Sequence, residues 1–210
     1  MPRPKRSNPL ALAVLSTLLS GPAHPYELAT TMRERGKHES IKLNYGSLYS
    51  VVEQLEKAGL IRPVETFREG RRPERTVYEL TDAGRAEHDD WLAELISTPV
   101  KEYPAFEAAL SIMGGLPPEE VMRLLRLRSG QLEVALRQVK SAREVADEHE
   151  IPRLFLIEDE FRTALLETEA KFVITLLDDM ESGRLVDLGA WRAIVEQSRQ
   201  GADPREASPP

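Results

Sequence analysis

The spacing of apolar and polar residues over the first hundred positions predicts four helices. Apolar residues dominate the segment behind Asn8-Pro9, a pair that is typical of a helix start. Leu28 and Met32, four residues apart, predict a second helix. Glycines follow the first three segments, and glycine is the residue that most often ends a helix. The predicted helices cover about residues 9–19, 25–35, 45–58 and 82–97.

The third of these helices combines a narrow apolar stripe with a face of small residues. Leu48, Val52 and Leu55 are spaced to form the stripe, which is expected to face the core. Gly46 and Ser50 lie roughly opposite the stripe, so the helix can approach another surface closely. The first turns also carry side chains that form hydrogen bonds, namely Asn44, Tyr45, Ser47 and Tyr49.

Two β-leaning stretches, residues 60–68 and 76–81, predict a hairpin. Three helices, a hairpin and a further helix is the order of a winged helix-turn-helix, in which the third helix enters the DNA major groove and the wing lies along phosphates. We therefore predict a mainly α fold with a minor α+β part. The tip of the predicted wing carries four arginines, Arg68, Arg71, Arg72 and Arg75.

The rest of the chain predicts a helical domain. The connector is rich in proline and glycine and holds one short helix near residues 106–113. Two long helices, about 118–149 and 153–182, and a short one near 187–197 follow. The predicted organisation is a flexible basic arm (1–7), a winged helix-turn-helix domain (8–98), a connector (99–117), a helical dimerisation domain (118–199) and a disordered tail (200–210).

The two long helices predict a homodimer. Apolar residues of the first repeat at alternating three- and four-residue spacing, as in a coiled coil. The second has two apolar faces and so needs two neighbours, of which the first long helix supplies one and a second subunit the other. The residues predicted to mediate dimerisation are Leu125, Leu132, Val139, Phe161, Leu165, Phe172 and Leu176.

Charge is distributed unevenly along the 210 residues. The net charge of −7 argues against nucleic acid, because Lys and Arg drive binding to phosphates. Residues 1–75 nevertheless hold 13 Lys and Arg against 8 Asp and Glu, which leaves 15 against 27 for the remainder. A basic N-terminal part (the basic head, residues 1–75) followed by an acidic remainder (the acidic body) is the asymmetry expected when one part of a protein approaches a polyanion.

Little in the sequence points to catalysis, a cofactor or a membrane. The chain has no cysteine, and its 4 histidines show no metal-binding spacing. There is no glycine-rich phosphate loop, so we predict no enzyme activity, no cofactor and no metal. The longest apolar stretch, Leu10 to Leu19, is too short to span a bilayer. We therefore expect a cytoplasmic protein.

Five short motifs in register resemble the PadR family of transcriptional regulators, and the helical remainder is similar to PadR proteins with an AphA-like C-terminal half. The resemblance implies a homodimer on an inverted-repeat operator, with repression relieved by an effector. Pro25 and Tyr45 depart from the family pattern, which commonly has glycine and proline there. The motifs are His24-Pro25-Tyr26-Glu27-Leu28, Asn44-Tyr45-Gly46-Ser47-Leu48-Tyr49, Leu55-Glu56-Lys57-Ala58-Gly59-Leu60-Ile61, Gly70-Arg71-Arg72 and Tyr78-Glu79-Leu80-Thr81-Asp82-Ala83-Gly84.

These considerations predict contacts to double-stranded DNA from the second helix, the third helix and the wing. Tyrosine hydroxyls and short polar groups reach phosphates and base edges, and arginines pair with phosphates. Packing of the tyrosines and a solvated charged turn remain the alternatives, and Tyr26 either touches the DNA backbone or caps the core. The predicted contacts are Tyr26, Asn44, Tyr45, Gly46, Ser47, Tyr49, Ser50, Arg68, Arg71, Arg72 and Arg75.

The resemblance further implies an effector pocket, because multidrug-binding relatives place aromatic residues toward the dimer cavity. Trp91, Tyr103 and Phe106 would border such a pocket for a small aromatic or hydrophobic effector, with a plain core or interface role as the alternative. The principal hypothesis is therefore an operator-binding regulator. Its rival is a winged-helix module that binds proteins and not operator DNA. A third hypothesis is an enzyme whose site the sequence does not display.

Overall fold

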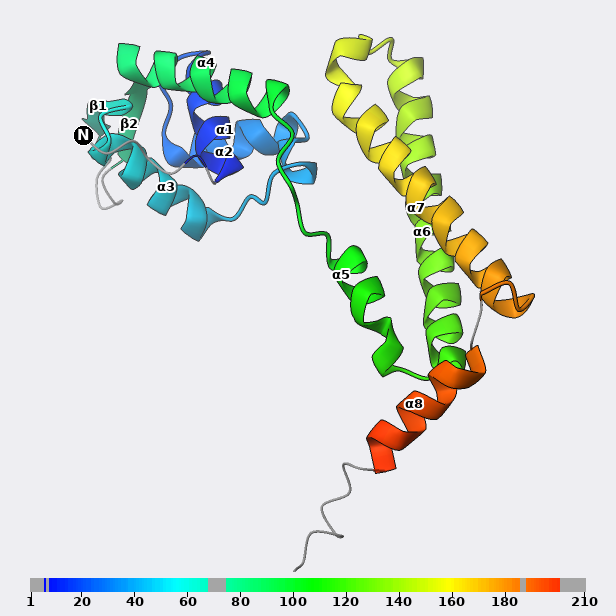
Figure 1. Cartoon of the computed structure of the whole chain (residues 1–210). Coiled ribbons are helices and arrows are strands. Elements are labelled where there is room, and N and C mark those ends of the chain that lie inside the picture. Colours follow the sequence, from blue (N-terminus) through cyan, green and yellow to red (C-terminus); the bar gives the residue numbers. More distant parts are fainter. Residues whose placement is uncertain (1–5, 7, 68–74, 186–187, 201–210) are drawn as a thin grey trace, which may run out of the picture. The chain divides into compact units, whose positions relative to one another are not determined.

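The computed structural model describes residues 6, 8–67, 75–185 and 188–200. The chain divides into two compact units, Met1–Lys101 and Glu102–Pro210, each with its own arrangement of elements (Figure 1). No helix within the described ranges is both long and apolar enough to cross a membrane.

The N-terminal unit has the predicted order of three helices, a hairpin and a fourth helix. This order and the long helices of the second unit confirm the predicted fold class, a mainly α protein with a winged helix-turn-helix. A short 3₁₀ helix after the second helix was not predicted from the sequence. The elements are α1 (Pro9–Leu18), α2 (Pro25–Glu34), η1 (Lys37–Glu39), α3 (Tyr45–Lys57), β1 (Ile61–Phe67), β2 (Arg75–Leu80) and α4 (Asp82–Ser97).

Side-chain caps fix where these helices begin. The Asn8 carboxamide accepts a hydrogen bond from the backbone of Leu10 at 3.1 Å, and Asn44 accepts one from Ser47 at 2.7 Å. The Thr81 hydroxyl in turn accepts one from the backbone of Gly84 at 3.0 Å. Each cap satisfies a backbone N–H that has no partner inside its own helix. The three predicted helix starts are therefore confirmed.

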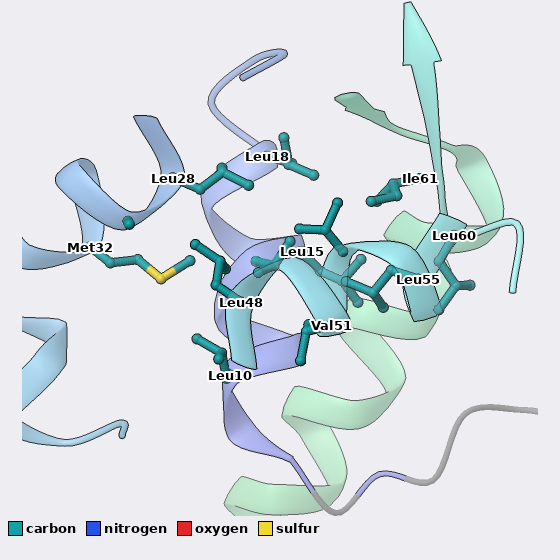
Figure 2. Close-up of a cluster of buried hydrophobic side chains, with 13 residues drawn as sticks. Leu10, Leu15, Leu18, Leu28, Met32, Leu48, Val51, Leu55, Leu60 and Ile61 are labelled. Atoms are coloured by element: carbon teal, nitrogen blue, oxygen red, sulfur yellow. The ribbon is translucent and has the colours of Figure 1, made fainter. Parts of the chain in front are cut away.

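The N-terminal core lies between α1, α2, α3 and the start of β1 (Figure 2). The predicted stripe of α3 is buried, since Leu48, Val52 and Leu55 are almost inaccessible to solvent. Leu15 of α1 and Leu28 of α2 belong to the same cluster. Burial of this stripe fixes the rotation of α3 and turns its opposite face outward.

The two strands form an antiparallel hairpin in which Ile61 is opposite Leu80. The register shifts between Pro63 and Glu65, where the ladder has an irregularity of the bulge type. Ala23 extends the sheet, because its backbone exchanges two 3.0 Å hydrogen bonds with Tyr78. The predicted tip, including Arg68, Arg71 and Arg72, lies outside the described residues.

The C-terminal unit is built on two long helices that pack side by side (Figure 1). Its core joins Val121, Leu125 and Leu132 to Val173 and Leu177 on the other long helix. Its elements are α5 (Ala105–Ile112), η2 (Met113–Gly115), α6 (Pro118–Glu148), η3 (Arg153–Phe155), α7 (Ile157–Glu181) and α8 (Leu188–Gln200). The second long helix thus begins after a 3₁₀ turn, a few residues later than predicted.

This core contains two of the residues predicted to mediate dimerisation. Leu125 and Leu132 are already buried within one chain, so they have little surface left to bury against a partner. The other apolar face of α7 is open: Phe161 is 66% exposed, and Leu165 and Phe172 are about half exposed. Val139, the remaining predicted residue of α6, is partly buried.

Candidate nucleic-acid interface

The outward face of α3 begins at its first turn. Tyr45 and Tyr49 are exposed, as are Gly46 and Ser50, whereas Ser47 is half-buried. Asn44 is exposed and holds the first turn through its cap. Because the buried stripe points inward, the residues predicted to touch DNA lie on the solvent side of the winged unit. The structure thus gathers the predicted residues of α3 on one surface.

Tyr26 of α2 lies next to this turn. Its side chain is 58% exposed, so it does not cap the core. Its ring stacks on the ring of Tyr45, with centroids 6.1 Å apart and planes 10° from parallel. The two rings therefore link α2 to the first residue of α3.

Arg33, which was not among the residues predicted from the sequence, contacts the same tyrosine. The guanidinium carbon lies 4.6 Å from the Tyr45 ring centroid, and an Arg33 N–H donates to the Tyr45 hydroxyl at 2.6 Å. Tyr26 and Arg33 are seven residues apart, which places them on one face of α2, two turns apart. The sequence shows this spacing, but it does not show the contact with Tyr45, because Tyr45 belongs to another helix.

The hairpin is tied to α3 by a polar contact. Tyr78 of β2 donates its hydroxyl hydrogen to a Glu56 carboxylate oxygen at 3.2 Å. Burial raises the pKa of Tyr78, and the Glu56 charge raises it further, so the hydroxyl stays protonated as a donor at neutral pH. A groove of about 420 Å³ lies here, lined by residues of α2, α3 and β2 that include Tyr49, Ser50 and Tyr78.

Positive charge is scarce along α3 itself. The helix has no basic residue before Lys57, and Lys57 pairs with Glu53 at 2.6 Å. This pairing lowers the pKa of Glu53, first through the hydrogen bond and then through the Lys57 charge. Cations that approach phosphates near the first turns of α3 must therefore come from other elements. Of the predicted wing arginines, Arg75 begins β2, opposite Phe67.

Arg6 differs from its predicted place in a flexible arm. Its guanidinium pairs with Glu87 at 2.7 Å and also with Glu94, so it is fixed to α4. The hydrogen bonds to Glu87 and then Glu94 raise the pKa of Arg6 above its ordinary value. The other predicted arm residues lie outside the described ranges.

The three aromatic residues predicted to border an effector pocket are divided between the two units. Trp91 is 2% exposed in the N-terminal unit, and its indole N–H has no acceptor among the described residues. Tyr103 belongs to the C-terminal unit and is 82% exposed. Phe106 lines a groove of about 650 Å³ between α5 and α6, within the C-terminal unit.

Phe106 has well-defined neighbours in that groove. The Arg128 guanidinium carbon lies 3.7 Å from the centroid of its ring, and the ring of Phe172 meets it edge-on at 6.4 Å. Arg128 also pairs with Glu169 at 2.6 Å. Apart from Gln131, the remaining wall is apolar and includes Leu110, Met113, Leu116 and Leu124. An apolar groove with one cation at its edge suits a small aromatic or hydrophobic ligand.

Residues 14–90 match the model of the transcriptional regulator PadR-like family. This segment runs from the middle of α1 into α4 and includes α2, α3 and the hairpin. Residues 14–90 form a PadR-like domain. The surface around Tyr26 and Tyr45 therefore belongs to a domain of a transcriptional regulator family.

Solved structures resemble the chain beyond the PadR-like domain. Bacillus subtilis PadR in complex with operator DNA is 18% identical, with a TM-score of 0.66 over 82% of this chain and 99% of that one. A PadR-like transcriptional regulator from Bacillus cereus is 17% identical, with a TM-score of 0.55 over 83% and 99%. Bacillus subtilis PadR with p-coumaric acid is 19% identical, with a TM-score of 0.53 over 78% and 98%. These identities establish a common fold, and no curated protein matches the chain significantly.

Proposed function

We propose that this chain is a sequence-specific DNA-binding regulator that acts as a homodimer on an inverted-repeat operator and represses transcription. The exposed first turn of α3 carries the proposal, because its hydrogen-bonding side chains are held outward by a buried stripe. The operator complex of Bacillus subtilis PadR, which shares the fold, supports the same use of this surface.

The open face of α7 supports the homodimer. Phe161 and Leu165 are more than half exposed, and Phe172, which meets Phe106 edge-on, is about half exposed, so much of this apolar stripe is uncovered in one chain. An isologous contact between two such stripes buries both and supplies the second neighbour that α7 needs. It also gives the complex two winged units, which an inverted repeat requires.

Removal of the wing charges is expected to weaken DNA binding. Arg71→Ala combined with Arg72→Ala should lower the affinity for all duplexes. The plot of log binding constant against log salt concentration should also become flatter, by up to about 2 for each pair of lost phosphate contacts. The measurement is a gel shift with the DNA upstream of the chain's own gene, repeated over a salt series. A scrambled duplex of equal length gives the sequence-independent part.

The matched control for this test is Arg62→Ala, which also removes an arginine from the hairpin. Arg62 pairs with Glu79 at 2.6 Å, so its charge is already neutralised by the protein. A wild-type chain that binds both duplexes equally would contradict operator recognition and favour the protein-binding alternative. An unchanged slope in the double variant would show that Arg71 and Arg72 do not contact phosphates.

We further propose that a small aromatic or hydrophobic effector occupies the groove between α5 and α6 and releases the DNA. Leu124→Trp is expected to fill this groove, because Leu124 lines it and is partly exposed. Binding of p-coumaric acid, used as a probe because a relative of the same fold binds it, should weaken at least about 10-fold. Isothermal titration calorimetry measures the change.

Val134→Trp is the control, since Val134 is an exposed residue of α6 that does not line the groove. Equal binding of the probe to the wild type and both variants would place the ligand elsewhere. A wild-type chain that binds no p-coumaric acid would exclude this aromatic acid as a ligand.

A further inference from the structure

Three side chains at the junction of α2 and α3 form one stacked group. The rings of Tyr26 and Tyr45 lie 6.1 Å apart and nearly parallel, and the Arg33 guanidinium carbon lies 4.6 Å from the Tyr45 centroid. Two helical turns, or about 10 Å, separate positions 26 and 33 along α2. Tyr45 contacts both side chains. We call these three residues the Tyr45 stack.

The stack fixes the orientation of Tyr45. An Arg33 N–H donates to the Tyr45 hydroxyl at 2.6 Å, which fixes the outer end of the ring as well as its face. Tyr45 is the first residue of α3, directly after the Asn44 cap. A side chain at this position extends from the helix end that meets DNA in a winged unit. The stack therefore orders a side chain that would otherwise rotate in solvent.

Arg33 brings a positive charge to the junction of α2 and α3. Among the described residues no carboxylate forms an ion pair with Arg33, whereas Arg6, Arg62 and Lys57 all have such partners. Arg33 is exposed, and α3 has no basic residue of its own before Lys57. A guanidinium has five N–H donors, and the bond to the Tyr45 hydroxyl uses one of them. The described residues leave the remaining donors to an external anion.

We propose that Arg33 binds a backbone phosphate of the operator and, together with Tyr26, holds Tyr45 in one orientation against the DNA. This proposal rests on the DNA-binding function proposed above and adds a residue outside the third helix and the wing. A planar guanidinium suits both tasks, because it stacks on an aromatic ring and presents paired donors to phosphate. Lysine has the charge but lacks the flat surface.

Arg33→Gln tests the phosphate contact. We expect about 10-fold weaker binding to the promoter duplex and a salt slope flatter by about 2 in the homodimer, one phosphate for each subunit. Fluorescence anisotropy over a salt series measures both quantities. Arg35→Gln is the matched control: it removes an exposed arginine two residues away, for which no contact with Tyr45 is found among the described residues. Equal losses in the two variants would overturn the assignment, since only general charge would then matter.

Arg33→Lys separates the charge from the stacking. The slope should stay close to that of the wild type, while the preference for promoter over scrambled duplex falls about fivefold, because the tyrosine is no longer held. Tyr45→Leu should lose preference to a similar degree, and adding Arg33→Lys to it should cost little more. Additive losses would show that the residues act separately.

These experiments distinguish the proposal from the function on which it rests. A wild-type chain that binds no duplex would overturn both. Wild-type binding with a promoter preference, combined with an unchanged slope in Arg33→Gln, would overturn only the role of Arg33. Thermal unfolding of each variant checks the fold, and the exposed positions of Arg33 and Arg35 predict little change.

Discussion

Replacing Phe161 and Leu165 together by glutamate is expected to yield a folded monomer that binds the promoter duplex at least about 100-fold more weakly than the wild type. Both side chains lie on the open face of α7, outside the core that Val173 and Leu177 form with α6. Two carboxylates on each stripe would repel their counterparts across a dimer contact and would have to lose water to enter it. Light scattering after gel filtration gives the mass, and anisotropy gives the affinity.

The large effect on affinity arises from linkage of two winged units. When one winged unit of a dimer binds its half-site, the second unit is held near the other half-site at a high effective concentration. A monomer lacks this gain in affinity. Ile174→Glu is the control, because Ile174 is 55% exposed but lies on the opposite side of α7 from Phe172. A dimeric double variant, or a control that dissociates equally, would place the interface elsewhere.

Gly84→Ala is expected to destabilise the N-terminal unit by about 3 kcal/mol, the upper part of the range for overpacked cores. A Cβ atom at position 84 would lie 1.9 Å from the Leu60 carbonyl oxygen and 2.9 Å from the carbon of the same carbonyl. These atoms are backbone, so relief requires α4 to move away from the end of α3. The Thr81 hydroxyl lies 2.8 Å from the Gly59 carbonyl oxygen and 3.0 Å from that of Leu60, so such a shift also disturbs the cap.

The expected fall in melting temperature is about 15 °C for a unit of this size. The fluorescence of Trp91, buried in α4, reports on the N-terminal unit when both proteins also carry Trp191→Phe. Gly46→Ala is the matched control within α3 of the same unit: the added carbon would meet only the Asn44 side-chain oxygen, at an ordinary 3.8 Å, and alanine is expected to stabilise a helix by about 0.5–1 kcal/mol. A loss as large for Gly46→Ala as for Gly84→Ala would refute the steric explanation.

Much of the fold was predictable because its determinants are local. The Asn44 cap is made by a side chain and a backbone group three residues apart, and Gly59 ends the turn after α3 with a φ of 71°. The buried stripe of α3 follows from helical periodicity alone. In contrast, the unpredicted η1 and the later start of α7 concern short turns, for which the sequence has no comparable periodic signal.

The candidate interface was only partly predictable. Tyr26 and Tyr45 were identified from the positions of their helices, but their stacking and the contact with Arg33 depend on how α2 packs against α3. The predicted effector pocket stays a prediction, because Trp91 and Phe106 belong to different units of the structure. The sequence has no signal for the neighbours of Phe106, which packs against Arg128 of α6.

By itself, the sequence determined the order of elements, their caps and the division between a basic head and an acidic body, since each depends on neighbouring residues or on composition. Only the tertiary structure decided which apolar faces the chain covers itself. Leu125 and Phe161 look equally suited to an interface in the sequence, yet α6 buries Leu125 against α7 and leaves Phe161 open. Periodicity shows that a helix has an apolar face, but only the packing of the helices shows which neighbour covers it.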